Sequence, residues 1–505
     1  MEKISIIDIG SNVARIVIAN IIDGGYFNVV DELKETVQIT KGLQTDGYLH
    51  DEKINQLVVT LNSFKALSAS HNVSKTFAYV TSAINEARNK KQFLETVLTS
   101  SGIKLQILSQ EEECQYVYNG VVNSLDIPKG VIIDLGGSTT KIIYYNRKQI
   151  VNHTTMPFGC VTLTDKFMSI TDPNERSAQI EAYVTSELDK VDWISTFSEE
   201  VSFIGVGGSI RNLGKISRKF KHYPINSNHN YRLDFIDDFE NIHNTLKAID
   251  ITSPARIKGI SASRAELLPA ASSCLRAIKD KFNIKELVIS CSGFREGRLF
   301  RYAVPSTAEK PIQDILGHSI YTLLNIFNTS VTHSAHVYDL AAQLYRNLKV
   351  LHKFPKNYAK VMRAAAQLHD IGAAYNFYNH ASHSFYFILN SSLFGLTHKE
   401  LLMASIIAGL HGNGSANDIP HLQQYLPLLT QDEMMAIKKM AVILRIAESF
   451  DRSMSGVITT ISCDILGDSV ILKTDSNGNK SLEIRDAYQV INDFKHAFGK
   501  SLNIL

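Results

Sequence analysis

Apolar runs broken by a glycine-bearing turn occur twice in the first third of the chain. Residues 4–19 read ISIIDIGSNVARIVIA, and residues 130–145 read GVIIDLGGSTTKIIYY. In both segments, stretches rich in β-branched residues flank a short polar turn, which is typical of a β-hairpin. The two hairpins are separated by about a quarter of the chain, which indicates two similar lobes and not a short solenoid repeat.

The two segments align residue by residue when Ile6 is set against Ile132. The alignment pairs Asp8 with Asp134, Gly10 with Gly136, and Arg15 with Lys141. The cation after each turn is also explained by an outward-facing strand residue. Aspartates at such strand ends commonly reach Mg²⁺, because a hard cation prefers oxygen ligands.

A third glycine turn interrupts residues 203–216, FIGVGGSIRNLGKI. An apolar strand enters Gly207, Gly208 and Ser209, and a helical pattern follows. Glycine lets the backbone approach an anion closely, and the first N–H groups of a helix point toward it. One such turn is explained by a tight structural bend, whereas three favour a phosphate cleft between two lobes.

A helix with an acidic first turn is predicted between the first two turns, at residues 107–121. Ser109 and Glu112 have the spacing of a capping box, and an acidic first turn also suits the helix dipole. The glutamates are therefore explained by helix stability alone. A glutamate at the mouth of a phosphate cleft would equally be suited to activate water.

The periodicity becomes helical from about residue 311. Amphipathic helices are predicted at 332–345 and 361–372, with further helical segments to about 455. The tail, residues 456–505, combines strand-like and helix-like stretches and is interpreted as a small α+β cap.

Composition adds few constraints. The chain has 505 residues, 44% hydrophobic and 20% charged, and a formal charge of +2, so no basic field indicates nucleic acid. The five cysteines form no CxxC pair, which favours reduced thiols. No apolar run approaches the ~20 residues of a membrane helix, and the start of the chain does not resemble a signal peptide. A cytoplasmic protein that binds neither membranes nor nucleic acid is expected.

Several motifs together resemble the exopolyphosphatase/guanosine pentaphosphate phosphatase family. They are IIDIGSN, TSAINEARN (81–89), SQEEECQYVYNGV, IIDLGGST, FGCVTLTDKF (158–167), GVGGSIRNLGKI and SGFREG (292–297), in the family's order. The resemblance covers about residues 1–305. It implies an α/β, actin/hexokinase-like (ribonuclease H-like) fold with two lobes around a cleft, and Mg²⁺-assisted release of terminal phosphate. It divides the chain into lobes 1–126 and 127–305, a helical domain 306–455 and the cap 456–505.

The resemblance also assigns roles to residues. Glu113 matches the base that positions the attacking water, and Asp134 matches the cleft acid associated with Mg²⁺. Arg295 matches a cleft arginine. The phosphate loops correspond to Gly10, Ser11 and Asn12, to Gly136, Gly137, Ser138 and Thr139, and to Gly207, Gly208 and Ser209.

Two positions depart from the family pattern. Lys141 stands where the family usually has a glutamate, and Asn85 stands where it usually has an arginine. Arg88, one helical turn later, is a candidate replacement for that arginine. An acid replaced by a cation changes the local charge by two units, which either displaces Mg²⁺ or provides a direct phosphate contact.

The helical half resembles an HD domain, an extension found on longer members of the family. His333, His369, Asp370 and Asp451 match its four metal-ligand positions. His383 and His411 correspond to the additional ligands of two-metal versions, and His336 and His380 are neighbours without an assigned role. Such a set suits Mn, Fe or Zn. A purely structural helical domain is the alternative.

Three functions remain open on the sequence. The first is an exopolyphosphatase-type hydrolase acting on polyphosphate or on guanosine pentaphosphate. The second is a catalytically weak regulator that binds these ligands, which Lys141 and Asn85 favour. The third is a metal-dependent HD-domain phosphohydrolase acting on a nucleotide. A sugar kinase of the same fold would not explain the glutamate run at 111–113. The resemblance also implies a homodimer.

Overall fold

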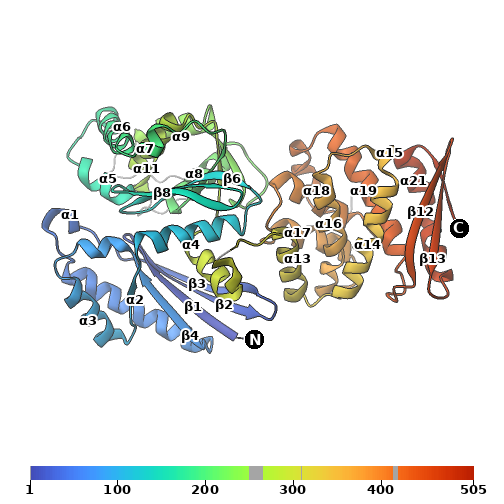
Figure 1. The fold of residues 1–505 in the computed structure, drawn as a ribbon, viewed down its shortest axis with the longest axis horizontal. Helices are drawn as coiled ribbons and strands as arrows, with labels where there is room; N and C mark the ends of the chain where they lie inside the picture. Colours follow the sequence, from blue (N-terminus) through green and yellow to red (C-terminus); the bar gives the residue numbers. More distant parts are fainter. Residues whose placement is uncertain (1, 249–264, 309, 413–418) are drawn as a thin grey trace. The chain divides into compact units, whose positions relative to one another are not determined.

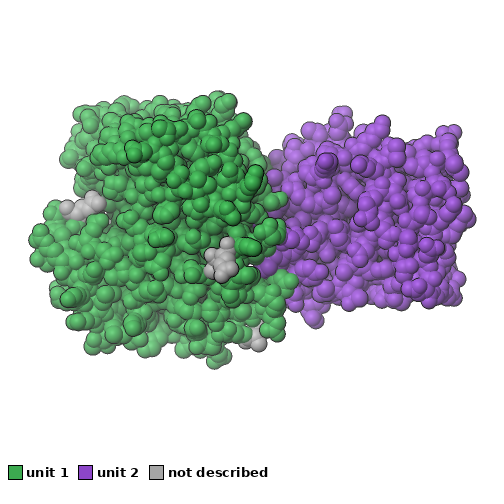
Figure 2. Space-filling model, viewed as in Figure 1, with its two compact units in different colours: residues 1–223, 228–313 green, residues 224–227, 314–505 purple. Residues whose placement is uncertain are grey.

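The computed structural model describes residues 2–248, 265–308, 310–412 and 419–505. The chain divides into two compact units (Figure 2). Unit 1 comprises residues 1–223 and 228–313, and unit 2 comprises 224–227 and 314–505. The four-part division expected from the sequence is finer than these units and stays a prediction. Within the described segments, no helix combines the length and apolar character needed to cross a bilayer.

Unit 1 holds two α/β lobes, each built on a twisted mixed sheet (Figure 1). The sheet of the first lobe has the order β3-β2-β1-β4-β5. Its elements are β1 (Glu2–Ile9), β2 (Val13–Ile22), β3 (Tyr26–Thr36), α1 (Leu43–Asp46), α2 (Asp51–Ser70), β4 (Lys75–Val80), η1 (Ser82–Glu86), α3 (Lys90–Ser101), β5 (Gln106–Ile107) and α4 (Gln110–Val122). Strands β1, β2 and β3 are antiparallel neighbours, and β1 pairs in parallel with β4.

The second lobe repeats this plan with a sheet of order β10-β11-β9-β6-β7-β8. Its elements are β6 (Lys129–Leu135), β7 (Thr140–Asn146), β8 (Gln149–Met156), α5 (Cys160–Phe167), α6 (Pro173–Asp189), α7 (Asp192–Ser195), β9 (Ser202–Val206), α8 (Gly208–Phe220), β10 (Tyr231–Asp234), α9 (Asp238–Lys247), α11 (Leu268–Phe282), β11 (Glu286–Ile289), α12 (Phe294–Ala303) and η2 (Pro305–Ala308). Both predicted hairpins are confirmed as the antiparallel pairs β1–β2 and β6–β7. The expected two-lobed α/β fold is therefore present.

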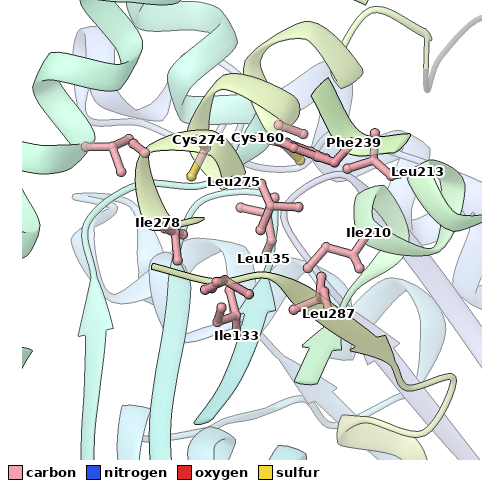
Figure 3. Close-up of a cluster of buried hydrophobic side chains, with 14 of the residues drawn as sticks. Ile133, Leu135, Cys160, Ile210, Leu213, Phe239, Cys274, Leu275, Ile278 and Leu287 are labelled. Atoms are coloured by element: carbon pink, nitrogen blue, oxygen red, sulfur yellow. The ribbon is translucent and has the colours of Figure 1, made fainter. Parts of the chain in front are cut away.

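The central strands β1 and β6 are buried on both faces, since successive strand residues point to opposite sides and most of them are buried here. In β6, Ile133 and Leu135 join the core beneath α5, α6, α8, α9 and α11, part of which Figure 3 shows. The neighbouring Ile132 faces the other way and packs with Val117 and Val121 of α4. Nearly every side chain of α4 after its first turn is buried. The packing of helix α4 therefore fixes the position of its N-terminal turn.

Helices α4 and α12 approach each other unusually closely. A Cβ atom on Gly297 of α12 would lie 1.8 Å from the carbonyl oxygen of Tyr116, and a Cβ on Gly120 of α4 would lie 2.2 Å from that of Gly293. Only glycine permits this contact. On their outer side both helices cover the first sheet, where Tyr116 and Leu299 pack with Ile4 and Ile6.

Unit 2 is helical and ends in a small sheet, as expected from the sequence. Its elements are α13 (Ile315–Ile326), α14 (Val331–Asn347), α15 (Lys349–His352), α16 (Tyr358–Leu368), η3 (Ile371–Ala374), α17 (His380–Asn390), α18 (His398–Gly409), η5 (Leu422–Gln424), η6 (Leu426–Leu428), α19 (Gln431–Ser449), β12 (Ile458–Leu466), β13 (Ser469–Ser476), α20 (Ser481–Ala487), η7 (Tyr488–Val490), α21 (Ile491–Phe498) and β14 (Ser501–Ile504). The sheet has the order β12-β13-β14. Helix α18 is buried along its whole length, so it forms the centre of the helical core.

Candidate functional site

The two hairpin turns have the same local geometry. In the first, the N–H of Gly10 donates to the carbonyl of Val13 at 3.0 Å, and in the second, the N–H of Gly136 donates to that of Thr139 at 3.0 Å. Asp8 lies opposite Arg15 in the first hairpin, and Asp134 lies opposite Lys141 in the second. The sequence repeat is thus a structural repeat, with an aspartate and a cation paired across each hairpin.

Both turns, together with the third glycine turn, line one cleft of unit 1. All ten predicted loop residues line it: Gly10, Ser11, Asn12, Gly136, Gly137, Ser138, Thr139, Gly207, Gly208 and Ser209. The hydroxyl of Ser138 donates to that of Ser11 at 2.7 Å and also contacts the hydroxyl of Thr40 at 3.2 Å. These bonds join the two turns across the lobes.

The third turn is suited to an anion. Gly207 has φ +110°, and a Cβ there would lie 2.4 Å from the carbonyl oxygen of Leu135, so the position requires glycine. Helix α8 begins at the next residue and directs its first N–H groups outward. Within the described residues, the buried hydroxyl of Ser209 and the buried side-chain amide of Asn12 have no hydrogen-bond partner. These groups are free to bind phosphate oxygens.

Glu113 is held in the cleft by the start of α4. Ser109 and Glu112 form the predicted capping box, which fixes the first turn of the helix. Glu113 therefore faces inward, and its Oε1 accepts the backbone N–H of Ser82 at 2.7 Å. The capping role belongs to Glu112, which leaves Glu113 available for chemistry.

Lys141 forms an ion pair with Glu113. Its Nζ lies 2.7 Å from Oε2 of Glu113 and 4.0 Å from Oδ2 of Asp134, and the side chains of Lys141 and Glu113 are only 8% and 7% exposed. Burial by itself would lower the pKa of Lys141, but the two carboxylates outweigh it and raise that pKa above its ordinary value. Burial raises the pKa of Asp134.

The residues around Asp134 do not fit the Mg²⁺ that the family resemblance implies. A divalent cation there would have to bind between the carboxylates that the Lys141 ammonium already bridges, and like charges repel in a buried site. Among the described residues, the groups of three or more His, Cys, Asp and Glu side chains close enough to share one metal ion all lie in unit 2. The charge of Lys141 therefore disfavours Mg²⁺ bound to Asp134.

Three arginines supply the anion-binding charge of the cleft. Arg295, predicted from the sequence, lines it together with Arg15 and Arg211, which the sequence did not identify as site residues. Burial and then the charges of Arg295 and Arg211 lower the pKa of Arg15 to about 10. Glu32 forms only long ion pairs with two of these arginines, at 3.6 Å from Arg15 and 3.7 Å from Arg295. Mutually repelling cations of this kind stabilise a bound polyanion.

Arg88 does not lie in this cleft. It is exposed, and its guanidinium carbon lies 5.6 Å from the ring centre of Tyr48. Asn85 is also exposed and accepts a hydrogen bond from Lys90 at 3.1 Å. The prediction that Arg88 binds phosphate is corrected, because its exposed side chain lies over the ring of Tyr48 and does not line the cleft.

Unit 2 gathers a second polar site. Its centre is Asp370, whose carboxylate lies 3.6 Å from His333 and 3.5 Å from His369. Asp451 accepts from Nδ1 of His333 at 2.7 Å. Three of the four predicted ligands, His333, His369 and Asp370, therefore lie close enough to share a metal ion, whereas Asp451 contacts His333. His369 is fully buried, and within the described residues its Nε2 has no hydrogen-bond partner.

The additional ligands differ partly from the prediction. His411 is present, with Nε2 3.5 Å from Asp370. His380, not His383, is its neighbour, at 3.3 Å from Asp370 and 2.9 Å from Nε2 of His411. His383 instead packs edge-on against Tyr375, because a residue three positions along α17 points elsewhere.

Two further residues, Glu448 and His336, lie near this site. Glu448 of α19 was not anticipated, although it precedes Asp451 by about one helical turn. His336 lies 4.0 Å from Asp451. Within the described residues, the groups that can hold a metal ion are His333, His369 and Asp370; His369, His411 and Glu448; and Asp370, His380 and His411. Neither His336 nor Asp451 belongs to one of these groups.

Comparisons with known proteins agree with the family resemblance of the sequence motifs. A family model described as the Ppx/GppA phosphatase family matches residues 17–304, and one described as Ppx/GppA phosphatase, domain III, matches 315–486. A Ppx/GppA family member from Aquifex aeolicus is 25% identical, with a TM-score of 0.51 over 60% of this chain and 98% of that chain. An exopolyphosphatase from Cytophaga hutchinsonii, 20% identical with a TM-score of 0.56 over 60% and 98%, shares the fold. The HD assignment of the helical half stays a prediction.

Proposed function

Because the chain belongs to the Ppx/GppA phosphatase family and is accordingly a phosphoric anhydride hydrolase, we propose that it releases the terminal phosphate of inorganic polyphosphate. Guanosine pentaphosphate, cleaved at its terminal 5′-phosphate, presents the same anhydride and is the alternative substrate. The observation that supports this proposal is the convergence of three glycine turns, three arginines and Glu113 on one cleft.

Phosphoryl transfer requires mainly positioning and neutralisation of charge. The backbone N–H groups of the turns and the start of α8 hold the terminal phosphate in this proposal. Nδ2 of Asn12 and the hydroxyl of Ser209 donate to its oxygens, which would satisfy these two unpaired donors. Arg15, Arg211 and Arg295 neutralise the negative charge of the phosphates.

Glu113 is the base in this proposal. A carboxylate offers about four acceptor positions, so Oε2 accepts a water proton while it also accepts from Lys141. The water oxygen forms a bond to the terminal phosphorus, and the bond to the bridging oxygen breaks. The water proton passes to Glu113, and the shortened polyphosphate leaves with the bond's electron pair.

The first test compares phosphate release from long-chain polyphosphate by the wild type and by Glu113→Gln, with Mg²⁺ supplied as the substrate's counterion. The variant is expected to lose about two orders of magnitude or more, because it lacks the base but keeps the shape. Glu111→Gln is the matched control, since Glu111 is in the same helical turn but exposed, and it should keep wild-type activity.

Other results of the phosphate-release assay would favour other functions. Equal activity of the wild type and Glu113→Gln would contradict the cleft mechanism. Tight binding of tripolyphosphate without any release of phosphate would favour the regulator. The same assay with guanosine pentaphosphate decides between the two substrates by the ratio of their kcat/KM values.

A second candidate function is a metal-dependent phosphohydrolase in unit 2, favoured by its three overlapping groups of potential ligands. The pocket beside them also contains Arg445 and Arg452, which are suited to a phosphate group. Metal analysis of the purified chain is expected to find one or two Mn, Fe or Zn ions per chain, and fewer in Asp370→Asn, because Asp370 belongs to two of the three groups. Phosphate release from a nucleotide should then depend on Asp370 and not on Glu113.

The homodimer and the cytoplasmic location stay predictions. Light scattering on the purified chain tests the first, with a mass of twice 56.3 kDa expected.

A further inference from the structure

In the cleft, two carboxylates, Glu113 and Asp134, lie around one cation, and this cation is the ammonium of Lys141. Lys141 comes from β7, Asp134 from the opposite position of β6, and Glu113 from α4. Three elements of the fold thus deliver two acids and one cation to a single buried point, with Nζ 2.7 Å and 4.0 Å from the two carboxylates.

The surroundings keep the ammonium in place. Oε1 of Glu113 is held by the N–H of Ser82, so this carboxylate has a fixed orientation. The turn after β6 is closed by the hydrogen bond from Gly136 to Thr139, which fixes the register that sets Lys141 opposite Asp134. Moving Lys141 away would leave the buried Glu113 and the mostly buried Asp134 without the cation that lies nearest to both, which is unfavourable.

We propose that the Lys141 ammonium is the resident cation of this cleft and takes the place of a protein-bound divalent ion between Glu113 and Asp134. Lys141 is a positioning residue, which fixes Glu113 and supplies positive charge beside the terminal phosphate. It keeps its proton throughout the reaction. Divalent ions then enter the cleft only as counterions of the polyphosphate. The part of this inference that concerns phosphate rests on the proposed function, whereas the exclusion of a metal does not.

The consequence is measurable without turnover. The full chain is titrated with Mn²⁺ in the absence of substrate, and free Mn²⁺ is followed by electron paramagnetic resonance. All variants carry Asp370→Asn and Glu448→Gln, which together remove an acid from each of the three ligand groups of unit 2. In the parent chain, which keeps Lys141, Asp134→Asn is expected to leave the amount of bound Mn²⁺ unchanged. Lys141→Glu is expected to gain about one site per chain, which Asp134→Asn then removes.

Lys141→Met is the matched control, because it removes the charge without adding a ligand. It should gain much less Mn²⁺ binding than Lys141→Glu. The comparison distinguishes the effect of removing the repulsive ammonium from the effect of adding a carboxylate ligand. A merely structural role for Lys141 would give no gain in Lys141→Glu.

Two results would overturn the inference. The first is a Mn²⁺ site in the parent chain that is lost in Asp134→Asn, and this experiment stands even if Lys141→Glu fails to fold. The second is a folded Lys141→Glu chain that binds no more Mn²⁺ than its parent. Failure of the parent to hydrolyse polyphosphate would contradict the proposed function alone, because the Mn²⁺ titration requires no substrate.

Discussion

Nζ of Lys141 lies 2.7 Å from Oε2 of Glu113, and the two side chains are almost completely buried. This pair connects the hairpin β6–β7 of the second lobe to α4, the helix that packs against both sheets of unit 1. A buried pair of this kind is costly to break, because removal of one partner leaves an uncompensated charge. Glu113, the residue proposed as the base, thus also connects α4 to β7 through its ion pair with Lys141.

Lys141→Met is expected to lower the free energy of unfolding by about 3–5 kcal/mol. Adding Glu113→Gln should recover part of this loss, because the unpaired carboxylate is then removed. Urea unfolding of the two single variants and the double variant measures the coupling. Lys190→Met is the control, since the ion pair of Lys190 with Glu187 is exposed on the lysine side, and about 0–1 kcal/mol is expected there. Additive effects at positions 113 and 141 would contradict the pairing.

Tripolyphosphate is expected to raise the melting temperature of the chain, because it relieves the repulsion among Arg15, Arg211 and Arg295. Arg211→Met should weaken tripolyphosphate binding by about tenfold to a hundredfold, which corresponds to one charge-assisted hydrogen bond. Arg88→Met is the matched control, because this arginine is exposed and does not line the cleft. Calorimetric titration measures both affinities. Equal weakening in the two variants would argue against the cleft as the binding site.

Stability should fall as the pH drops from 6.5 toward 4, in part because of His243. This imidazole is fully buried, contacts Ser272 at 3.1 Å, and burial lowers its pKa from 6.5 to about 4. The unfolded chain therefore binds the proton more readily, and stability that is complete above pH 6.5 is lost as the pH approaches 4. The contribution is about 3 kcal/mol.

His243→Gln should flatten the dependence of the unfolding free energy on pH between 6.5 and 4. His153→Gln, at an exposed position, should leave it unchanged. Urea unfolding at a series of pH values measures the slopes. An unchanged slope in His243→Gln would show that this imidazole is not held neutral.

Gly297→Ala is expected to destabilise unit 1 and to reduce phosphate release. The new methyl group would lie 1.8 Å from the carbonyl oxygen of Tyr116, so α12 and α4 must separate. Overpacking of this kind typically costs about 1–3 kcal/mol. The shift also moves Glu113 relative to Arg295, since each lies near the start of one of these helices. Thermal unfolding and kcat measure the two effects, and unchanged values of both would contradict this close packing.

The local features of the chain were predictable because they depend on neighbours in sequence. The hairpins, the three glycine turns and the capped start of α4 follow from side-chain periodicity, glycine positions and the Ser109–Glu112 spacing. The repeat of Asp8 and Asp134 was also legible, and with it the equivalence of Arg15 and Lys141. Family resemblance then supplied candidate roles for these positions.

Other parts of the candidate sites were not predictable. Arg15 follows the same alternation as any outward-facing strand residue, and Arg211 resembles any polar residue of an amphipathic helix. Nothing in the periodicity distinguishes a cation that faces solvent from one that faces a second lobe. His380 and His383 lie on one turn of a helix, and only the placement of α17 beside Asp370 selects His380.

The sequence by itself determined which residues form strands, turns and helix starts, because these depend on local backbone preferences and on the spacing of apolar side chains. It also determined that a lysine stands where an acid was expected. Only the tertiary structure decided what that lysine contacts, because this depends on the distances from its ammonium to side chains that are remote in sequence. The ammonium lies between two carboxylates that are 28 and 7 positions away in the chain, and burial makes that arrangement electrostatically strong.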